Sequence, residues 1–180
     1  MKSIREAAHI VTRPIRIVQF GEGNFLRAFA DYMIDIANEQ GLMDAGIAVV
    51  KPIAAGNLDA FREQGCLYTV CLRGKKSGEI VNESRVVTSV QTVLDASEDY
   101  KAVMALAELP ELEFVISNTT EAGIAFDETD CYSAEPPAAY PGKLTKFLYK
   151  EETMNFAVSV FGRSENPFVK HALLAGIIKM

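Results

Sequence analysis

Apolar and polar positions change periodicity near the start of the chain. Residues 15–20 are almost continuously apolar, which is typical of a strand covered on both faces of a sheet. Two glycines, Gly21 and Gly23, follow, and from residue 25 apolar side chains recur at helical spacing. Gly41 stands where a glycine commonly ends a helix. The pattern therefore predicts a strand, a tight turn and a helix.

The predicted helix has one apolar face. Its apolar positions are Phe25, Leu26, Phe29, Ala30, Met33, Ile34 and Ala37. Its acidic residues fall elsewhere on the helix, at Asp31, Asp35 and Glu39. This amphipathic pattern is typical of a helix that lies on a sheet.

A second apolar run, residues 46–50, ends at Lys51 and Pro52. Strand, helix and strand within about 40 residues form a βαβ unit, whose strands are parallel and whose crossover is right-handed. The glycine turn then lies at the carboxyl edge of the sheet, where open α/β folds bind ligands. We therefore predict an α/β fold with a Rossmann-like, mostly parallel sheet and helices on both faces.

The middle of the chain has a different pattern. Residues 67–73 are rich in β-forming side chains, residues 74–78 form a predicted turn with two lysines, and residues 80–93 are rich in Val and Thr. We interpret this part as an antiparallel excursion attached to the parallel sheet.

Regular patterns return after this excursion. Residues 98–109 form a predicted helix with Ser97 as its N-cap. Residues 114–117 form a predicted short buried strand, which brings residues 118–121 to the same sheet edge as the glycine turn.

The remaining segments contain less regular patterns. A polar loop over residues 127–141 precedes a predicted helix over residues 142–150. Residues 168–178 form an apolar helix candidate with no sheet partner of its own. We expect residues 151–180 to be a short helical appendage.

Composition and charge narrow the classes of function. Hydrophobic residues make up 49% of the chain, as in globular proteins. A net charge of -6, with the basic residues scattered, argues against a nucleic-acid partner. No apolar run approaches the ~20 residues that span a membrane, and residues 1–12 do not resemble a signal peptide. We expect a cytoplasmic protein without a membrane partner.

The cysteines do not form a metal-binding pattern. Cys66, Cys71 and Cys131 lack the spacing of a zinc site, and the chain has two histidines, His9 and His171. We expect reduced, mostly buried thiols and no metal.

The sequence GEGNFL at residues 21–26 matches G-x-G-x-x-G except at Leu26. Its position after a strand and before a helix is the context that a dinucleotide fingerprint requires. Gly21 would allow the tight turn, Gly23 would allow a pyrophosphate to approach closely, and Leu26 would set the helix slightly further from the sheet. A structural turn without a ligand and the glycine turn of a methyltransferase remain alternatives, and the threonine-rich loop after Ser117 disfavours the methyltransferase.

Lys51 occupies the end of the second strand, where nucleotide-binding folds usually have an acidic residue for the ribose. It could face the 2′-phosphate of NADP, or it could be a solvated lysine at a strand end. The choice between NAD and NADP therefore stays open at this point.

Two further groups could carry chemistry. Asn118, Thr119, Thr120 and Glu121 could bond a ribose or a carboxamide, or they could act only as caps of an ordinary loop. Lys170 and His171 could transfer protons, but neighbours in a helix point in different directions, and a solvated face is the favoured interpretation.

Three motifs are longer than the generic fingerprint: VQFGEGNFLRAF at residues 18–29, SNTTEAGI at residues 117–124 and YPGKLT at residues 140–145. Together they resemble the mannitol dehydrogenase family of long-chain polyol dehydrogenases. Within that family the match looks closest to the tagaturonate reductases, also called altronate oxidoreductases. The resemblance covers roughly residues 14–150, and in its light Leu26 is a family trait.

The resemblance implies an NAD-dependent oxidoreductase that passes hydride between a nicotinamide and a sugar-acid carbonyl. It implies an NAD(P)-binding domain over residues 1–150, followed in the family by a larger helical domain. The acid/base of such enzymes is a lysine in a K-x-x-x-x-N-x-x-H motif, and no lysine of this chain has Asn and His at those offsets. Residues 151–180 resemble a remnant of that second domain, so we expect the chain to lack the catalytic segment and to be inactive alone.

The expected cofactor-binding residues are Val18, Gln19, Phe20, Gly21, Glu22, Gly23, Asn24, Phe25, Leu26, Arg27, Asn118, Thr119, Thr120 and Glu121. The expected cofactor is NAD, with NADP open, and the expected substrate is a sugar acid or polyol. A mannonate or mannitol dehydrogenase relative and a non-catalytic dinucleotide-binding fragment remain alternatives. Surfaces exposed by truncation predict self-association.

Overall fold

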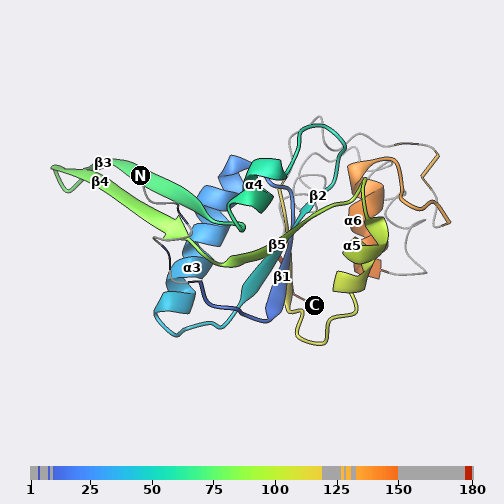
Figure 1. Cartoon of the computed structure of the whole chain (residues 1–180), viewed down its shortest axis with the longest axis horizontal. Helices are drawn as coiled ribbons and strands as arrows, with labels where there is room; N and C mark the ends of the chain where they lie inside the picture. Colours follow the sequence, from blue (N-terminus) through green and yellow to red (C-terminus); the bar gives the residue numbers. More distant parts are fainter. Residues whose placement is uncertain are drawn as a thin grey trace.

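A mostly parallel sheet forms the centre of the molecule (Figure 1). The computed structural model describes residues 4, 8, 10–118, 127, 129, 130, 133–149 and 177–179. The five strands follow the order β5-β2-β1-β6-β7. Their bounds are Ile15–Phe20 (β1), Gly46–Lys51 (β2), Val90–Asp95 (β5), Phe114–Ser117 (β6) and Ile177–Lys179 (β7). The first four strands of that order pair in parallel and β7 pairs antiparallel with β6, which confirms the Rossmann-like α/β prediction.

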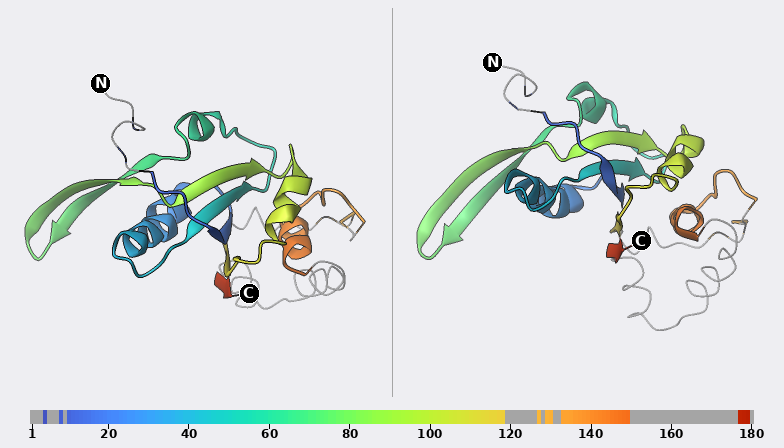
Figure 2. Two further views of the ribbon diagram at one scale, coloured as in Figure 1. Left: turned by 60° about the horizontal axis from the view of Figure 1, so that its bottom comes forward. Right: turned by 90° about the horizontal axis from the view of Figure 1, so that it is seen from below.

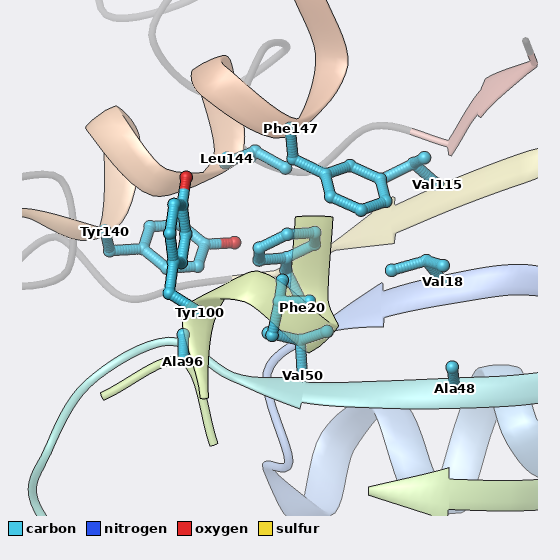
Figure 3. Packing of buried hydrophobic residues seen from close by; sticks show 11 residues of the cluster. Val18, Phe20, Ala48, Val50, Ala96, Tyr100, Val115, Tyr140, Leu144 and Phe147 are labelled. Carbon is cyan, nitrogen blue, oxygen red and sulfur yellow. The ribbon is translucent and has the colours of Figure 1, made fainter. Parts of the chain in front are cut away.

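Strand β1 lies between two hydrophobic clusters, because successive side chains of a strand point to opposite faces. Val18 and Phe20 face α5 (Tyr100–Leu106) and α6 (Tyr140–Tyr149) in the cluster of Figure 3. The Phe20 ring lies 5.1 Å from that of Phe147, measured between centroids, in an edge-to-face arrangement. Ile17 belongs to the cluster on the opposite face, together with Leu26 and Ala30 of the first helix.

The helical segment after β1 is continuous but contains a π turn. It consists of α2 (Asn24–Leu26), the π-helical η1 (Arg27–Asp31) and α3 (Tyr32–Glu39). A further short helix, α4 (Asp59–Glu63), follows β2. Gly41 has a φ of +68°, so the predicted end of the helix at this glycine is confirmed.

The predicted burial of this helix is partly wrong. Phe25, Phe29 and Met33 are 62%, 54% and 48% exposed, whereas Asp31 and Asp35 are buried. Asp35 Oδ2 accepts a hydrogen bond from Arg85 Nε at 2.6 Å, so the hairpin supplies a buried carboxylate with a cation. Periodicity cannot show this reversal, because the partner lies 50 residues away in the sequence.

The antiparallel part is a hairpin of β3 (Tyr68–Lys76) and β4 (Glu79–Val87), which projects away from the sheet in Figures 1 and 2. Its turn is the pair Ser77 and Gly78, with φ values of +53° and +89°, and not the predicted residues 74–78. The prediction of one antiparallel excursion over residues 67–93 is correct for the hairpin and wrong for its last part, because β5 joins the parallel sheet. The Val-rich run hides that break, which falls at Thr88 and Ser89.

Three other boundaries differ from the prediction. Helix α5 is capped by Asp99, whose Oδ1 accepts from Ala102 N at 2.9 Å, whereas Ser97 hydrogen-bonds to Asp95. Helix α6 begins at Tyr140, which places Pro141 in its first turn, where proline is tolerated. Residues 177–179 form a strand rather than the predicted end of a helix, because they pair with β6, while residues 168–176 lie outside the described residues. Within the described part of the chain, no helix is long and apolar enough to cross a membrane.

Candidate functional site

The glycine turn lies where three parallel strands end. The Gly21 N–H donates to the Val50 carbonyl at 2.8 Å, which ties the turn to β2. A Cβ atom on Gly21 would lie 3.4 Å from the carbonyl oxygen of Asn118, the residue after β6. The φ of Gly21 is +113°, a conformation that L side chains rarely adopt. The predicted role of Gly21 in a tight turn is confirmed.

Gly23 has a different environment. Its backbone is extended, with φ -64° and ψ 152°, and a Cβ atom would meet nothing within 4 Å among the described residues. It is the N-cap residue of α2, and no side chain caps that helix end. The first backbone N–H groups of a helix have no intrahelical partner. The start of α2 therefore offers hydrogen-bond donors next to space that the described residues leave open.

A recess of ≈ 240 Å³ opens beside the turn. Its lining residues are Glu22, Arg27, Asn57, Leu58, Ala60, Phe61, Gln64 and Tyr68. The Arg27 guanidinium carbon lies 5.5 Å from the ring centroids of both Phe61 and Tyr68. Residues 57–64 and Tyr68 were not among the predicted site residues, although the Asn-Leu-Asp sequence at the start of α4 after β2 was an available signal.

Lys51 is neither solvated nor available to a ligand, so both interpretations of it are wrong. Its side chain is 1% exposed, and its Nζ lies 2.5 Å from Asp95 Oδ2. Burial alone would raise the pKa of Asp95, but hydrogen bonds from Lys51 and Ser97 to the carboxylate lower this pKa to about 2. The end of β2 is thus closed by a buried ion pair with β5.

Gln19 and Leu26 lie behind the turn. Gln19 is fully buried, and its Nε2 donates to the Gly21 carbonyl at 3.1 Å. Leu26 is 5% exposed and contributes to the core between helix and sheet, in place of the third glycine. Arg27 hydrogen-bonds through its guanidinium to the Asn24 side chain, which fixes the first turn of the helix.

Of residues 118–126, which follow β6 directly, the structure describes Asn118 alone. Asn118 lies against Gly21, as predicted, and the preceding Ser117 hydroxyl hydrogen-bonds to that of Tyr140 on α6. The other predicted site residues of this segment and of the C-terminal segment lie outside the described residues: Thr119, Thr120, Glu121, Lys170 and His171. Of the cysteines, Cys66 is buried, as expected, and Cys71 is exposed, whereas Cys131 lies outside the described residues.

Comparison with known proteins agrees with this geometry. The family described as "Mannitol dehydrogenase Rossmann domain" matches residues 15–160. An altronate oxidoreductase of Klebsiella pneumoniae subsp. pneumoniae is 47% identical over 145 residues, which cover 80% of this chain and 30% of that protein. The chain thus spans about 30% of the length of the curated relatives that it matches.

Solved structures show the same fold. A substrate-free D-sorbitol dehydrogenase aligns with a TM-score of 0.60 at 25% identity, over 75% of this chain and 31% of that one. The ternary complex of Pseudomonas fluorescens mannitol 2-dehydrogenase with NAD and D-mannitol aligns with a TM-score of 0.62 at 24% identity, over 76% and 30%. From the family match, the chain belongs to the mannitol dehydrogenase family and contains its Rossmann domain.

Proposed function

We propose that this chain binds NAD(H) at the glycine turn and acts as the cofactor domain of an altronate oxidoreductase, also called tagaturonate reductase. The observation that carries the proposal is the pairing of a positive-φ Gly21 with an open, uncapped helix start at Gly23. A pyrophosphate would accept hydrogen bonds from the backbone N–H groups at residues 24–26, because the Arg27 N–H already donates to the Gly23 carbonyl at 3.3 Å. Bound NAD(H) would supply the hydride for a sugar-acid carbonyl.

The residues around the glycine turn, the segment after β6 and the recess would complete the cofactor-binding site. Residues 18–23 would shape the turn, and Asn118 would lie near the nicotinamide ribose with Thr119, Thr120 and Glu121 beyond it. The recess around Arg27 and Phe61 would receive the adenosine half, since it adjoins both the turn and the segment after β2. We further assign residues 1–150 to the cofactor domain and residues 151–180 to a part of the helical domain.

NAD is favoured over NADP by the position of Lys51. A 2′-phosphate at the end of β2 requires a cation there, and Lys51 is committed to Asp95. Among the described residues that line the recess, Arg27 carries a positive charge and Glu22 a negative one. The acidic neighbour adds repulsion against a 2′-phosphate.

The substrate proposal rests on the relatives that are altronate oxidoreductases. The chain of 180 residues has no K-x-x-x-x-N-x-x-H motif, so we propose that it binds cofactor alone without turning over. A non-catalytic dinucleotide-binding fragment is the second candidate, favoured by the absence of that motif from the 180 residues.

Calorimetric titration of the purified chain with NADH, NADPH and S-adenosylmethionine tests the cofactor proposal. We expect saturable NADH binding, weaker NADPH binding and no S-adenosylmethionine binding. Tighter binding of S-adenosylmethionine than of NADH would overturn the proposal. Tagaturonate reduction, followed by NADH absorbance, should stay at background, and clear turnover would show that the chain is catalytically complete.

Self-association is a separate proposal, supported by the outer face of the first helical segment. Phe25 and Phe29 are exposed there with their rings stacked 5.5 Å apart, and Met33 follows one turn later. Residues spaced four apart form a ridge of the kind that helices use to associate.

A further inference from the structure

A buried polar cluster lies behind the glycine turn. Asp31, on the helical segment, and Gln19, on β1, are both fully buried. Tyr68 reaches the cluster from β3, and its hydroxyl oxygen lies 2.8 Å from Asp31 Oδ2 and 3.1 Å from the Arg27 carbonyl oxygen. Gln19 joins the cluster to the turn through its hydrogen bond to the Gly21 carbonyl. Asp31 Oδ1 and Gln19 Oε1 have no hydrogen-bond partner among the described residues.

The hydrogen count at Tyr68 depends on the protonation of Asp31. A phenol has one hydrogen to donate, and a backbone carbonyl and an ionised carboxylate are both acceptors only. With Asp31 ionised, Tyr68 can donate to one of its two neighbours, and the other contact has no hydrogen. With the proton on Asp31 Oδ2, the carboxyl donates to the phenol and the phenol donates to the Arg27 carbonyl. The protonated form alone turns both contacts into hydrogen bonds.

The surroundings of Asp31 favour the same form. Burial raises the pKa of Asp31 to about 7, although the hydrogen bond with Tyr68, the nearby Gln19 side chain and the charge of Arg27 oppose the rise. Burial and the neighbouring Asp31 carboxyl also raise the pKa of Tyr68, so the phenol keeps its hydrogen.

Other groups around the cluster are already engaged. Asp35, one turn further along the helix, pairs with Arg85 of β4 at 2.6 Å. Ser89, just before β5, donates a hydrogen bond from its hydroxyl to the Asp31 backbone carbonyl at 3.0 Å, and not to the Asp31 carboxyl. Of these groups, Asp35 adds a negative charge and none neutralises Asp31.

We propose that Asp31 is a positioning residue for the cofactor-binding site at the glycine turn. Its protonated carboxyl holds Tyr68 against the Arg27 carbonyl and so fixes the first helical turn after the glycines. The proposal rests on the proposed dinucleotide function. Arg27 and Tyr68 also line the recess beside the turn, so the cluster fixes one wall of that recess.

Loss of the Asp31 proton weakens cofactor binding for two reasons. The Tyr68 hydroxyl then donates to the carboxylate, and the Arg27 carbonyl loses its donor. A buried negative charge also appears behind a seat for an anionic pyrophosphate. If only the protonated form binds, NADH affinity falls about tenfold between about pH 6 and about pH 8. Cofactor binding in turn raises the pKa of Asp31, because the coupling is reciprocal.

The variant Asp31→Asn isolates the proton. The asparagine amide can donate to Tyr68 permanently, so it imitates the protonated acid in nearly the same volume. Calorimetric NADH titrations from about pH 6 to about pH 8.5 should show a falling affinity for the wild type and a flat profile for Asp31→Asn. Tyr68→Phe should bind more weakly at low pH because it removes the link to Arg27, and the pH dependence that it keeps should come only from the charge of Asp31.

The pH dependence of unfolding without cofactor tests the protonation of Asp31 independently of NADH binding. The folded pKa of Asp31 lies above the ordinary value of 3.8, so the folded protein binds more protons between about pH 4 and about pH 7. The free energy of unfolding of the wild type should therefore fall, relative to Asp31→Asn, as pH rises through that window. Carbon NMR of the aspartate carboxyls should show one resonance, absent in Asp31→Asn, that titrates near neutrality.

The outcomes separate the two proposals. Identical pH profiles of wild type and Asp31→Asn, in both unfolding and NADH binding, would overturn the role of Asp31. Failure of NADH to bind at any pH, with unfolding profiles that still differ, would overturn the proposed function and the positioning role while supporting the proton assignment. A pH-dependent affinity that Asp31→Asn removes supports both.

Discussion

The two faces of β1 differ in what they bury. On one face, Val18 and Phe20 meet an apolar layer from α5 and α6. On the other, Gln19 lies behind the glycine turn, and the helix above it buries the carboxyl of Asp31. The first face gains its stability from contact with hydrocarbon and aromatic rings, whereas the second adds buried polar groups, which reach the backbone of the turn, to an apolar cluster of its own. Both faces therefore maintain the fold, and the second also shapes the candidate site.

The largest effect is expected on the apolar face. Phe20→Ala should lower the free energy of unfolding by about 4 kcal/mol, because the ring is fully buried against Phe147 and truncation leaves a cavity. Chemical denaturation measures this loss. Phe25→Ala is the matched control on the exposed side, with an expected change within about 0.5 kcal/mol. Equal losses in the two variants would contradict the assignment of the core.

The ion pair at the end of β2 should have the next largest effect. Lys51→Met should cost about 3 kcal/mol, because Asp95 loses its cation while remaining buried. The corresponding change at the exposed pair of Arg62 and Glu98, Arg62→Met, should cost little. Since the folded pKa of Asp95 is about 2, its stabilisation is present above pH 3.8 and is lost as pH falls through about 2. An acid unfolding curve for Lys51→Met with the same shape as that of the wild type would contradict this account.

The two glycines of the turn should differ in how much their replacement lowers the stability of the fold. Gly21→Ala should cost about 2 kcal/mol, because a φ of +113° is strained for alanine. Gly23→Ala should leave the thermal midpoint nearly unchanged, since its φ is ordinary and no atom of the described residues would lie within 4 Å of the added Cβ. Thermal unfolding of both variants checks this, and a larger loss for Gly23→Ala would refute the described turn.

The smallest effect on stability is expected at the outer face of the first helix. Phe29→Lys should hardly change unfolding, because the side chain is 54% exposed. It should shift sedimentation towards the monomer if the ridge mediates self-association. Lys101→Ala, on α5 away from this ridge, is a control that should leave sedimentation unchanged. A wild-type chain that sediments as a monomer at high concentration would remove the self-association proposal.

The parts that the sequence predicted correctly depend on local pattern. The runs that form β1 and β2, the turn at Gly21 and the helix end at Gly41 follow from periodicity and glycine conformation within a few residues. Burial of Asp31 and Lys51 could not be predicted in this way. Their partners, Tyr68 and Asp95, lie 37 and 44 residues further along the chain, and only the folded sheet brings them close.

The break between β4 and β5 was hidden for a related reason. Val and Thr continue through it, and the chain changes sheets at Thr88 and Ser89 without glycine or proline. Thr88 is held there by Asp35, whose Oδ1 accepts from its backbone N–H at 2.7 Å. A long-range side-chain contact therefore marks a boundary that local composition does not.

Titration of NADH into wild type, Gly23→Val and Gly74→Val tests the central claim most directly. Gly74 lies in the hairpin and, like Gly23, has an ordinary φ and no atom of the described part of the chain within 4 Å of an added Cβ, so valine there controls for the added side chain. We predict saturable binding by wild type and Gly74→Val, and loss of binding by Gly23→Val at an unchanged thermal midpoint. Undiminished binding by Gly23→Val, or no binding by the wild type, would contradict the glycine turn as the cofactor seat.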